Sequence, residues 1–246
     1  MLTFKILIVV ALGLSVKSYS QERVTEVIYK KKSNVKLDYS NSSKNKSSIE
    51  IVEKAYSLVN NLNYSLLYNG NSSLFFEMSS LEIENENSIP IILAKSFGDT
   101  NGTFYTNSKL QSTIIQKEFD GEIFLIEKPF SNNNWQIEAD QKRIGNYLCQ
   151  KATKIIIRET ISGSKQVPIV AWFTVEIPIP YGPASYVGLP GLILEVEVDN
   201  IVIYASKIIK NALKDKRIEL PKNGKLITVE DFTKLEKEGF KYFKKF

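Results

Sequence analysis

The residues that could carry out catalysis are few, and a pair of glutamates is the first to consider. Glu195 and Glu197 lie two positions apart in a run that alternates with apolar residues. On a strand their side chains would share a face at roughly 7 Å, a separation at which paired carboxylates can hydrolyse a glycosidic bond. A half-solvated strand shows the same alternation, so the pattern favours a structural role. A carboxylate-based hydrolase stays open as an alternative, with Glu176 as a third acid that a cleft would bring in.

Other kinds of catalytic site are excluded or unmarked. The chain has no histidine, which excludes the Ser-His-Asp triad, the Cys-His pair and His-ligated metal or haem sites. A single cysteine, Cys149, excludes an internal disulfide and a Cys-cluster metal site, and is expected to be a small buried hydrophobe. Ser185 lies outside a G-x-S-x-G elbow, and nothing marks a lysine as its partner, although a Ser-Lys pair is not excluded. We expect no catalytic residue, metal or cofactor.

Most of the chain that would position these side chains has the pattern of strands. The dipeptide Asn69-Gly70 between two apolar runs predicts a hairpin with a tight two-residue turn in which both residues have positive φ. Asp120-Gly121 and Asp199-Asn200 predict further hairpin turns. Hairpin-linked strands indicate an antiparallel meander instead of βαβ units. The predicted strands are 64–68, 73–77, 89–95, 102–106, 111–119, 122–128, 134–138, 147–158, 170–177, 192–198 and 201–209.

Helices are predicted on either side of the strands in the chain. Apolar residues at helical spacing predict a helix over about 49–61, with Ser48 as its N-cap. Thr228 and Asp231 resemble a capping box that opens a C-terminal helix with a basic side, either packed on the protein or lying on a membrane surface. The polar stretch at about 33–48 indicates a linker or loop.

The fold class that follows is α+β, a strand-dominated antiparallel meander that forms a curved sheet or half-barrel, with one helix near the N-terminus and one at the C-terminus. Periplasmic lipoprotein carriers have a similar order of elements, which is an analogy of fold alone.

The N-terminal segment has the pattern of a secretory signal peptide over residues 1–20. A basic residue at Lys5 precedes an apolar run over 6–16, which is too short to span a bilayer, and small residues stand before Gln21. We expect a single domain over 21–246 that is exported, periplasmic or extracellular, with no transmembrane segment. The basic and acidic side chains, 32 and 27, are scattered, and the chain lacks the concentrated basic face of a nucleic-acid binder.

A proline-rich stretch separates two predicted strands. Pro178, Pro180 and Pro183 fix φ and remove backbone donors, so the stretch forms a rigid loop and not a central strand. Pro190 and Gly191 then suit the middle of a type II turn, with positive φ at the glycine. We expect a structural turn made by Gly188, Leu189, Pro190, Gly191, Leu192 and Ile193.

The string from Gly188 to Ile193 is the signature of the GLPGLI family, which comprises exported proteins of Bacteroidota bacteria. The chain resembles this family over most of its mature length, including the segments 119–126, 144–153 and 171–174. The resemblance implies a single GLPGLI-type domain. It implies no catalytic residue, because the family has no established activity.

Aromatic residues complete the candidate surface. Trp172 and Phe173 are neighbours on a predicted strand and point to opposite faces, so one is expected in the core while the other could line a groove. The candidate groove or partner surface is Trp172, Phe173, Pro178, Gly182, Pro183, Glu195 and Glu197.

The sequence as a whole favours a non-enzymatic exported binding or carrier domain of the cell envelope, with a hydrophobic ligand. An interaction module for an outer-membrane protein is the first alternative, and the carboxylate-based hydrolase is the second. A deep apolar groove would favour the carrier, and a flat apolar patch would favour the protein partner.

Overall fold

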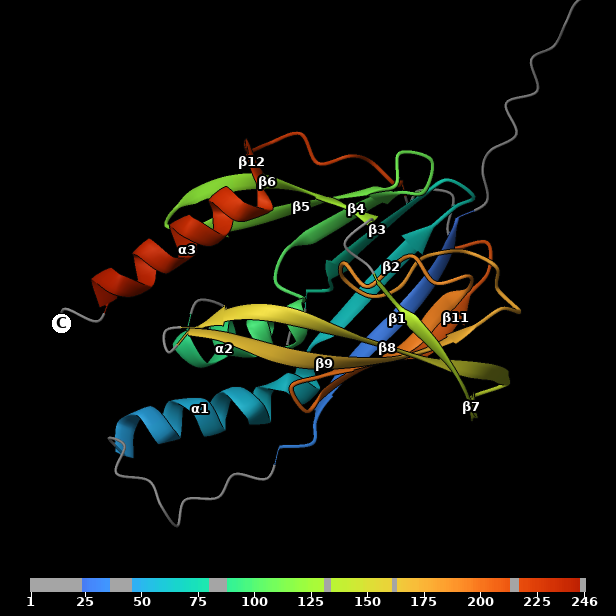
Figure 1. The fold of residues 1–246 in the computed structure, drawn as a ribbon, viewed down its shortest axis with the longest axis horizontal. Helices are drawn as coiled ribbons and strands as arrows, with labels where there is room; N and C mark the ends of the chain where they lie inside the picture. The colour runs from blue at the N-terminus through green and yellow to red at the C-terminus, as the bar shows by residue number, and fades with distance from the viewer. Residues whose placement is uncertain are drawn as a thin grey trace, which may run out of the picture.

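Twelve strands of the described chain form one sheet, in the order β12-β6-β5-β4-β3-β2-β1-β11-β10-β9-β8-β7 (Figure 1). The structure is a computed structural model, and it describes residues 24–35, 46–79, 88–130, 134–160, 163–212 and 217–243. The predicted signal peptide and its cleavage site lie outside the described residues. The strands are β1 (Thr25–Ser33), β2 (Asn63–Tyr68), β3 (Ser72–Glu77), β4 (Thr103–Asn107), β5 (Ser112–Phe119), β6 (Glu122–Pro129), β7 (Gln136–Ile144), β8 (Tyr147–Thr160), β9 (Gly163–Thr174), β10 (Leu192–Val198), β11 (Ile201–Ile209) and β12 (Lys225–Thr228).

The described helices are α1 (Lys46–Leu58), α2 (Ile89–Ser96) and α3 (Val229–Phe243), with single 3-10 turns at Val59–Asn61 and Phe97–Asp99. Helices α1 and α2 pack on each other, and the ring of Tyr56 on α1 stacks on Phe97. Helix α3 lies along β5 and β6 (Figure 1). The predicted class, a strand-dominated α+β meander with a curved sheet, is confirmed.

The strands that the sequence predicts to form hairpins do pair with each other. Strand β12 pairs parallel with β6, and the other neighbouring pairs are antiparallel. Asp199 and Asn200 have φ of 49° and 62° and join β10 to β11, with Val198 opposite Ile201. These positive φ values are those of a primed turn, so the predicted pairing across this dipeptide is confirmed.

The predicted turn at Asn69-Gly70 is wrong in type, although β2 and β3 do pair. Gly70 is absent from the residues with positive φ. The carboxamide oxygen of Asn69 instead accepts the backbone N–H groups of Asn71 and Ser72, at 3.0 and 2.8 Å. A local Asx turn therefore closes a longer loop.

The strand predicted at 89–95 is wrong, because these residues form α2. Pro90 suits the first turn of a helix, where its missing N–H costs nothing, and the buried residues Ile91 and Ala94 lie three apart on one helical face. A short apolar run does not by itself separate helix from strand.

Boundaries move elsewhere. Strand β9 spans Gly163–Thr174, whereas the sequence predicts a strand over 170–177. Helix α1 begins at Lys46, so Ser48 lies inside the helix and is not its cap. Strand β1 and α1 reach into both ends of the predicted 33–48 linker, of which residues 36–45 lie outside the described chain. The capping pair is confirmed, since the Asp231 N–H donates to Thr228 Oγ1 at 3.1 Å where α3 begins.

The sheet has an inner face, which carries Tyr29, Phe75, Phe104 and Phe124, and an opposite outer face. Cross-strand partners share a face, and the register runs without a break from Tyr29 on β1 to Phe124 on β6. The rings of Tyr29, Phe75 and Phe104 contact one another in sequence. The main core of the protein lies on this inner face.

The chain between β9 and β10, residues 175–191, crosses the inner face, and we call it the proline loop. Five of its side chains belong to the core and are no more than 3% exposed: Tyr181, Ala184, Tyr186, Val187 and Leu189. The hydroxyl of Tyr29 on β1 donates to the carbonyl oxygen of Ile193, just after the loop, at 2.6 Å. The rigid loop expected from the sequence is therefore part of the core and covers one side of the sheet.

Candidate functional site: a hollow on the inner face

A hollow of about 440 Å³ lies on the inner face, bounded by β5, β6, α3 and the proline loop. One wall is apolar and consists of Phe104, Ile115, Ile126, Val229 and Phe232. The end beside the proline loop is polar and carries Asp99, Lys128, Arg158 and Ser185. The ion pair of Lys117 and Glu236 also lines the hollow, next to Phe232. A concave site with an apolar wall and a few convergent polar groups is the usual form of a small-molecule site.

Helix α3 supplies part of the apolar wall. Phe232 is 4% exposed and meets Phe119 and Phe124 edge to face, with ring centroids 5.9 and 5.5 Å apart. Lys117 on β5 forms an ion pair with Glu236 on α3 at 2.6 Å. These contacts fix the helix over the sheet and set the width of the hollow.

The cations at the polar end come from strands far apart in the sheet order. Register places Lys128 on the inner face of β6, opposite Thr113, and places Lys154 and Arg158 on the inner face of β8, opposite Ile169 and Lys165. Strands β6 and β8 lie near the two ends of the sheet. Curvature of the sheet is what brings these side chains to one place.

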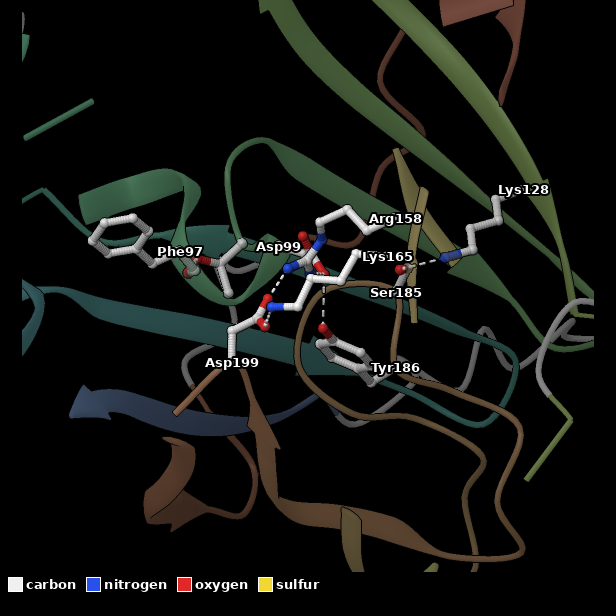
Figure 2. A network of polar contacts seen from close by, with 9 residues as sticks. Phe97, Asp99, Lys128, Arg158, Lys165, Ser185, Tyr186 and Asp199 are labelled. Atoms are coloured by element: carbon white, nitrogen blue, oxygen red, sulfur yellow. Dashed lines mark hydrogen bonds and ion pairs between the residues drawn. The ribbon is translucent and has the colours of Figure 1, made fainter. Parts of the chain in front are cut away.

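Lys128 and Ser185 are in direct contact at the polar end. The Lys128 Nζ donates a hydrogen bond to Ser185 Oγ at 3.0 Å (Figure 2). Burial lowers the pKa of Lys128 below 10.5, with the charge of Asp99 opposing the shift. A lysine of lowered pKa beside a serine is also the arrangement of a Ser-Lys nucleophile. Sequence reasoning found no marker for this pair.

Lys154 lies behind this contact, against two aromatic rings. Its Nζ is 4.3 Å from the Trp135 ring centroid and 5.5 Å from that of Tyr186. The residue is 8% exposed, and its pKa is lowered to about 7, first by burial and then by the positive charge of Lys128, with Asp99 opposing the shift. Burial therefore makes the charged forms of both Lys128 and Lys154 unfavourable.

Arg158 is held by carboxylates from two turns. Its guanidinium forms ion pairs with Asp99 Oδ2, at 2.8 Å, and with Asp199 Oδ2 (Figure 2). Asp99 also accepts the hydroxyl of Tyr186 at 3.0 Å, and burial raises the pKa of Tyr186 well above 10. The β10–β11 turn, through Asp199, therefore anchors β8 as well as reversing the chain.

The proline loop presents Ser185 in a constrained conformation. Ala184, just before it, has φ of 51°, a left-handed conformation that is uncommon for a residue other than glycine. Tyr186 N–H donates to Pro183 O at 3.0 Å, and Trp135 Nε1–H donates to Val187 O at 2.9 Å. A turn within the loop therefore holds Ser185, and Trp135 fixes the loop just after it.

The turn expected at Gly188 to Gly191 differs in its detail. Gly188 has φ of 92°, whereas Gly191 is absent from the residues of positive φ, so the predicted left-handed role of Gly191 is wrong. A Cβ at Gly191 would stand 2.1 Å from Thr174 O at the end of β9. Close approach of two backbones, and not a left-handed φ, is what requires glycine there.

The predicted groove residues divide between the two faces. Trp172 and Glu195 are cross-strand partners on the outer face, where Lys142 Nζ is 4.3 Å from the Trp172 ring centroid and 2.6 Å from Glu195 Oε1. Glu197 lines a separate outer hollow of about 230 Å³ with Pro168 and Val170.

The remaining predicted residues lie apart from this outer group. Phe173 is 1% exposed in the core, so the expectation that one of the two aromatic neighbours is buried is confirmed. Gly182 and Pro183 are buried in the proline loop, and Pro178 is exposed. A Cβ at Gly182 would stand 2.5 Å from Tyr186 O, so this glycine also serves close packing.

The acidic residues considered for hydrolysis have structural partners. Glu195 pairs with Lys142, and Glu176 accepts the Leu148 N–H at 2.9 Å. The described residues that line the inner hollow do not include Glu176, Glu195 or Glu197. Cys149 is buried as expected, and burial raises the pKa of its thiol to about 11. Within the described chain, no group of three or more Cys, Asp or Glu side chains could hold a metal ion.

The alternation of residues along β8 is a sequence signal for two of the cations on the inner face. Lys154 and Arg158 share strand parity with Ala152, on the buried side of β8, so alternation could have placed both cations toward the core. Lys128 and Ser185 are 57 positions apart and carry no such signal.

One protein family matches the region that holds this loop. The family described as "Protein of unknown function (Porph_ging)" matches residues 135–195. The matched segment runs from Trp135 to Glu195, so it contains the proline loop and the string at 188–193. No curated protein matches the chain.

Solved structures share the fold. Two structures of PNGF-II, in space groups C2 and P21, superpose with a TM-score of 0.50 each, at 15% and 16% identity over 86% and 87% of this chain. The superposed part is 32% and 33% of the PNGF-II chains, so this chain spans about a third of their length. LprF from Mycobacterium bovis superposes with a TM-score of only 0.29 at 11% identity, over 81% of this chain and 90% of its own. At these identities the likeness is one of fold alone. No helix of the described residues is long and apolar enough to cross a bilayer.

Proposed function

We propose that the protein is a binding domain that holds a hydrophobic small molecule in the inner hollow without chemical change. The observation that carries the proposal is the apolar wall formed by Phe104, Ile115, Ile126, Val229 and Phe232. The volume, about 440 Å³, lies in the usual range for small-molecule sites, roughly 300–1,000 Å³.

A second part of the proposal concerns the cellular location and the family of the protein. We propose an exported GLPGLI-type protein of the Bacteroidota with a signal peptide over 1–20 and one domain over 21–246, acting in the periplasm or outside the cell. The match to the Porph_ging family over 135–195, which contains the string Gly188 to Ile193, supports this placement.

One observation favours a second candidate, an interaction module for an outer-membrane protein. Ile155 and Ile157 lie on the outer face of β8 and are 64% and 60% exposed. Exposed apolar side chains that lie together on a sheet face are typical of a protein contact.

The test compares matched substitutions on the two faces. Ile115→Gln places an amide in the apolar wall, and Ile155→Gln makes the same change on the outer face. We expect the neutral dye N-phenyl-1-naphthylamine to bind the wild type with a rise in fluorescence, to bind Ile115→Gln at least fivefold more weakly, and to bind Ile155→Gln as it binds the wild type.

Three results would count against the proposal. Absence of dye binding to the folded wild type, or equal loss in both variants, contradicts a site in the inner hollow. Turnover of a p-nitrophenyl ester that Ser185→Ala abolishes contradicts binding without chemistry. Capture of an outer-membrane protein that Ile155→Gln alone abolishes would favour the interaction module.

A further inference from the structure

We propose that the molecule held in the inner hollow carries a carboxylate, which binds at Lys128 and Ser185 while its apolar part lies on the wall described above. This inference rests on the proposed function and names the chemical class of its ligand, a monocarboxylate with an aliphatic chain.

The first argument is a set of hydrogen-bond donors without acceptors. Lys128 Nζ donates one of its three N–H groups to Ser185 Oγ, which leaves the serine hydroxyl hydrogen to point elsewhere. Within the described chain, no carboxylate lies within 4.0 Å of Lys128 Nζ, and the Ser185 hydroxyl donates to no acceptor. Both side chains line the hollow. Neighbouring N–H and O–H donors that face the same space suit the two oxygens of one carboxylate.

The second argument is the charge around the polar end. The other cations that line the hollow are already paired with carboxylates, Lys117 with Glu236 and Arg158 with Asp99 and Asp199. Lys154 lies close enough that the charge of Lys128 disfavours its protonated form. Asp99 is the carboxylate that stabilises both lysines, and it already accepts from Arg158 and Tyr186. An added anion would relieve the repulsion between the two lysines.

The third argument is the direction that the strand gives to the ligand. Ile126 and Lys128 are two residues apart on β6 and share its inner face, so their side chains stand next to each other at roughly 7 Å. Phe232 on α3 faces Phe124 on the same strand face. A carboxylate at Lys128 therefore leads an aliphatic chain past Ile126 toward Phe232.

The experiment measures displacement of N-phenyl-1-naphthylamine by tetradecanoate and by tetradecan-1-ol at pH 7.4, using the mature chain. The two competitors share their alkyl chain and differ in the head group. We expect tetradecanoate to bind the wild type at least tenfold more tightly than the alcohol. Lys128→Met should remove this preference while binding of the alcohol is retained. Lys128→Arg should keep most of the preference for the acid, and Ser185→Ala should weaken the binding of tetradecanoate by a few-fold.

The control and the contrary results separate this inference from the proposed function. Lys142→Met removes a lysine from the outer face and should change neither competitor. If the dye binds but acid and alcohol compete equally, or if folded Lys128→Met keeps the preference for the acid, the carboxylate site is wrong and the hydrophobic hollow stands. If the dye does not bind the wild type, the proposed function fails first.

Discussion

Two lysine–tryptophan pairs, one on each face of the sheet, have the same geometry and different surroundings. Lys154 on the inner face and Lys142 on the outer face each place Nζ 4.3 Å from the centroid of an indole, that of Trp135 and that of Trp172. The Lys142 side chain is 35% exposed and has Glu195 at 2.6 Å. Lys154 is 8% exposed, and the positive charge of Lys128 acts on it.

The difference shows that burial, and not the contact with the ring, decides whether the lysine of such a pair is readily protonated. A cation–π contact contributes about 0.5–2 kcal/mol in either place. Burial makes the protonated form of Lys154 unfavourable, and its pKa is lowered to about 7. The outer pair is a common surface arrangement, whereas the inner pair holds a buried lysine whose protonated form is disfavoured. Such a cost, when kept in a fold, is typical of a functional site.

The largest expected effect comes from displacing the proline loop. This loop helps to bury Lys154, and burial is what distinguishes the inner lysine–tryptophan pair from the outer one. Gly191→Ala would put a Cβ 2.1 Å from Thr174 O, and we expect a loss of more than about 4 kcal/mol or no folding. Gly188→Ala is the control, since its φ of 92° predicts a left-handed cost of about 1–2 kcal/mol. Urea melts measure both, and equal losses would contradict the close-approach role of Gly191.

The next effect concerns α3, which covers β5 and β6 on the inner face. Phe232→Ala removes a ring that packs on Phe119 and Phe124, and we expect the stability of the helix contact to fall by about 3 kcal/mol. Hydrogen exchange should rise in α3 and β12 while β9 and β10 stay protected. Uniform loss of protection across the sheet would show that α3 is part of the main core instead.

The pH dependence of the free energy of unfolding should distinguish the inner lysine, Lys154, from the outer lysine, Lys142. Because the folded-state pKa of Lys154 lies near 7 and the unfolded value near 10.5, the unfolded chain binds more protons between these values. The free energy of unfolding therefore rises with pH from about 7 to 10, by up to about 1.4 kcal/mol per pH unit for this lysine. Lys31, whose pKa is also lowered to about 7 by burial, adds a similar rise.

Substitution then assigns the share of each side chain. Lys154→Met should reduce this slope by about 1.4 kcal/mol per pH unit between pH 8 and 9, and Lys142→Met should leave it unchanged. Denaturant melts at each pH provide the slopes. Equal slopes in the wild type and Lys154→Met would mean that Lys154 is not buried as described.

The smallest effect is expected at the outer pair. Glu195→Gln removes the carboxylate from Lys142, which stays in contact with solvent, and we expect a loss of about 0.2–1 kcal/mol. A loss of several kcal/mol in a thermal melt would show that the outer pair is as buried as the inner one, and the comparison would fail.

Local patterns in the sequence were enough for the meander but not for its exceptions. Asp199-Asn200 has the turn residues that a primed turn requires, and the pairing of β10 with β11 follows from them. The run at 89–95 is apolar enough for either strand or helix, and its packing against α1 decides in favour of a helix. The dipeptide Pro190-Gly191 predicts a left-handed turn because Pro-Gly is common there, whereas close approach to the Thr174 backbone explains the glycine.

The candidate site was missed for a related reason. Lys128, Lys154 and Ser185 lie on β6, β8 and the proline loop, and they meet only because the sheet curves and the loop crosses its inner face. The sequence predicted the loop and the strands separately. It offered no signal for a contact between residues 57 positions apart.

A crystal structure of the mature protein with tetradecanoate tests the central claim most directly. We predict the carboxylate within hydrogen-bond distance, about 2.7–3.2 Å, of Lys128 Nζ and Ser185 Oγ, with the alkyl chain along Ile126 and Phe232. Density for the ligand in the outer hollow beside Pro168 and Glu197, or an alkyl chain in the inner hollow with its carboxylate turned away from Lys128 to solvent, would contradict it.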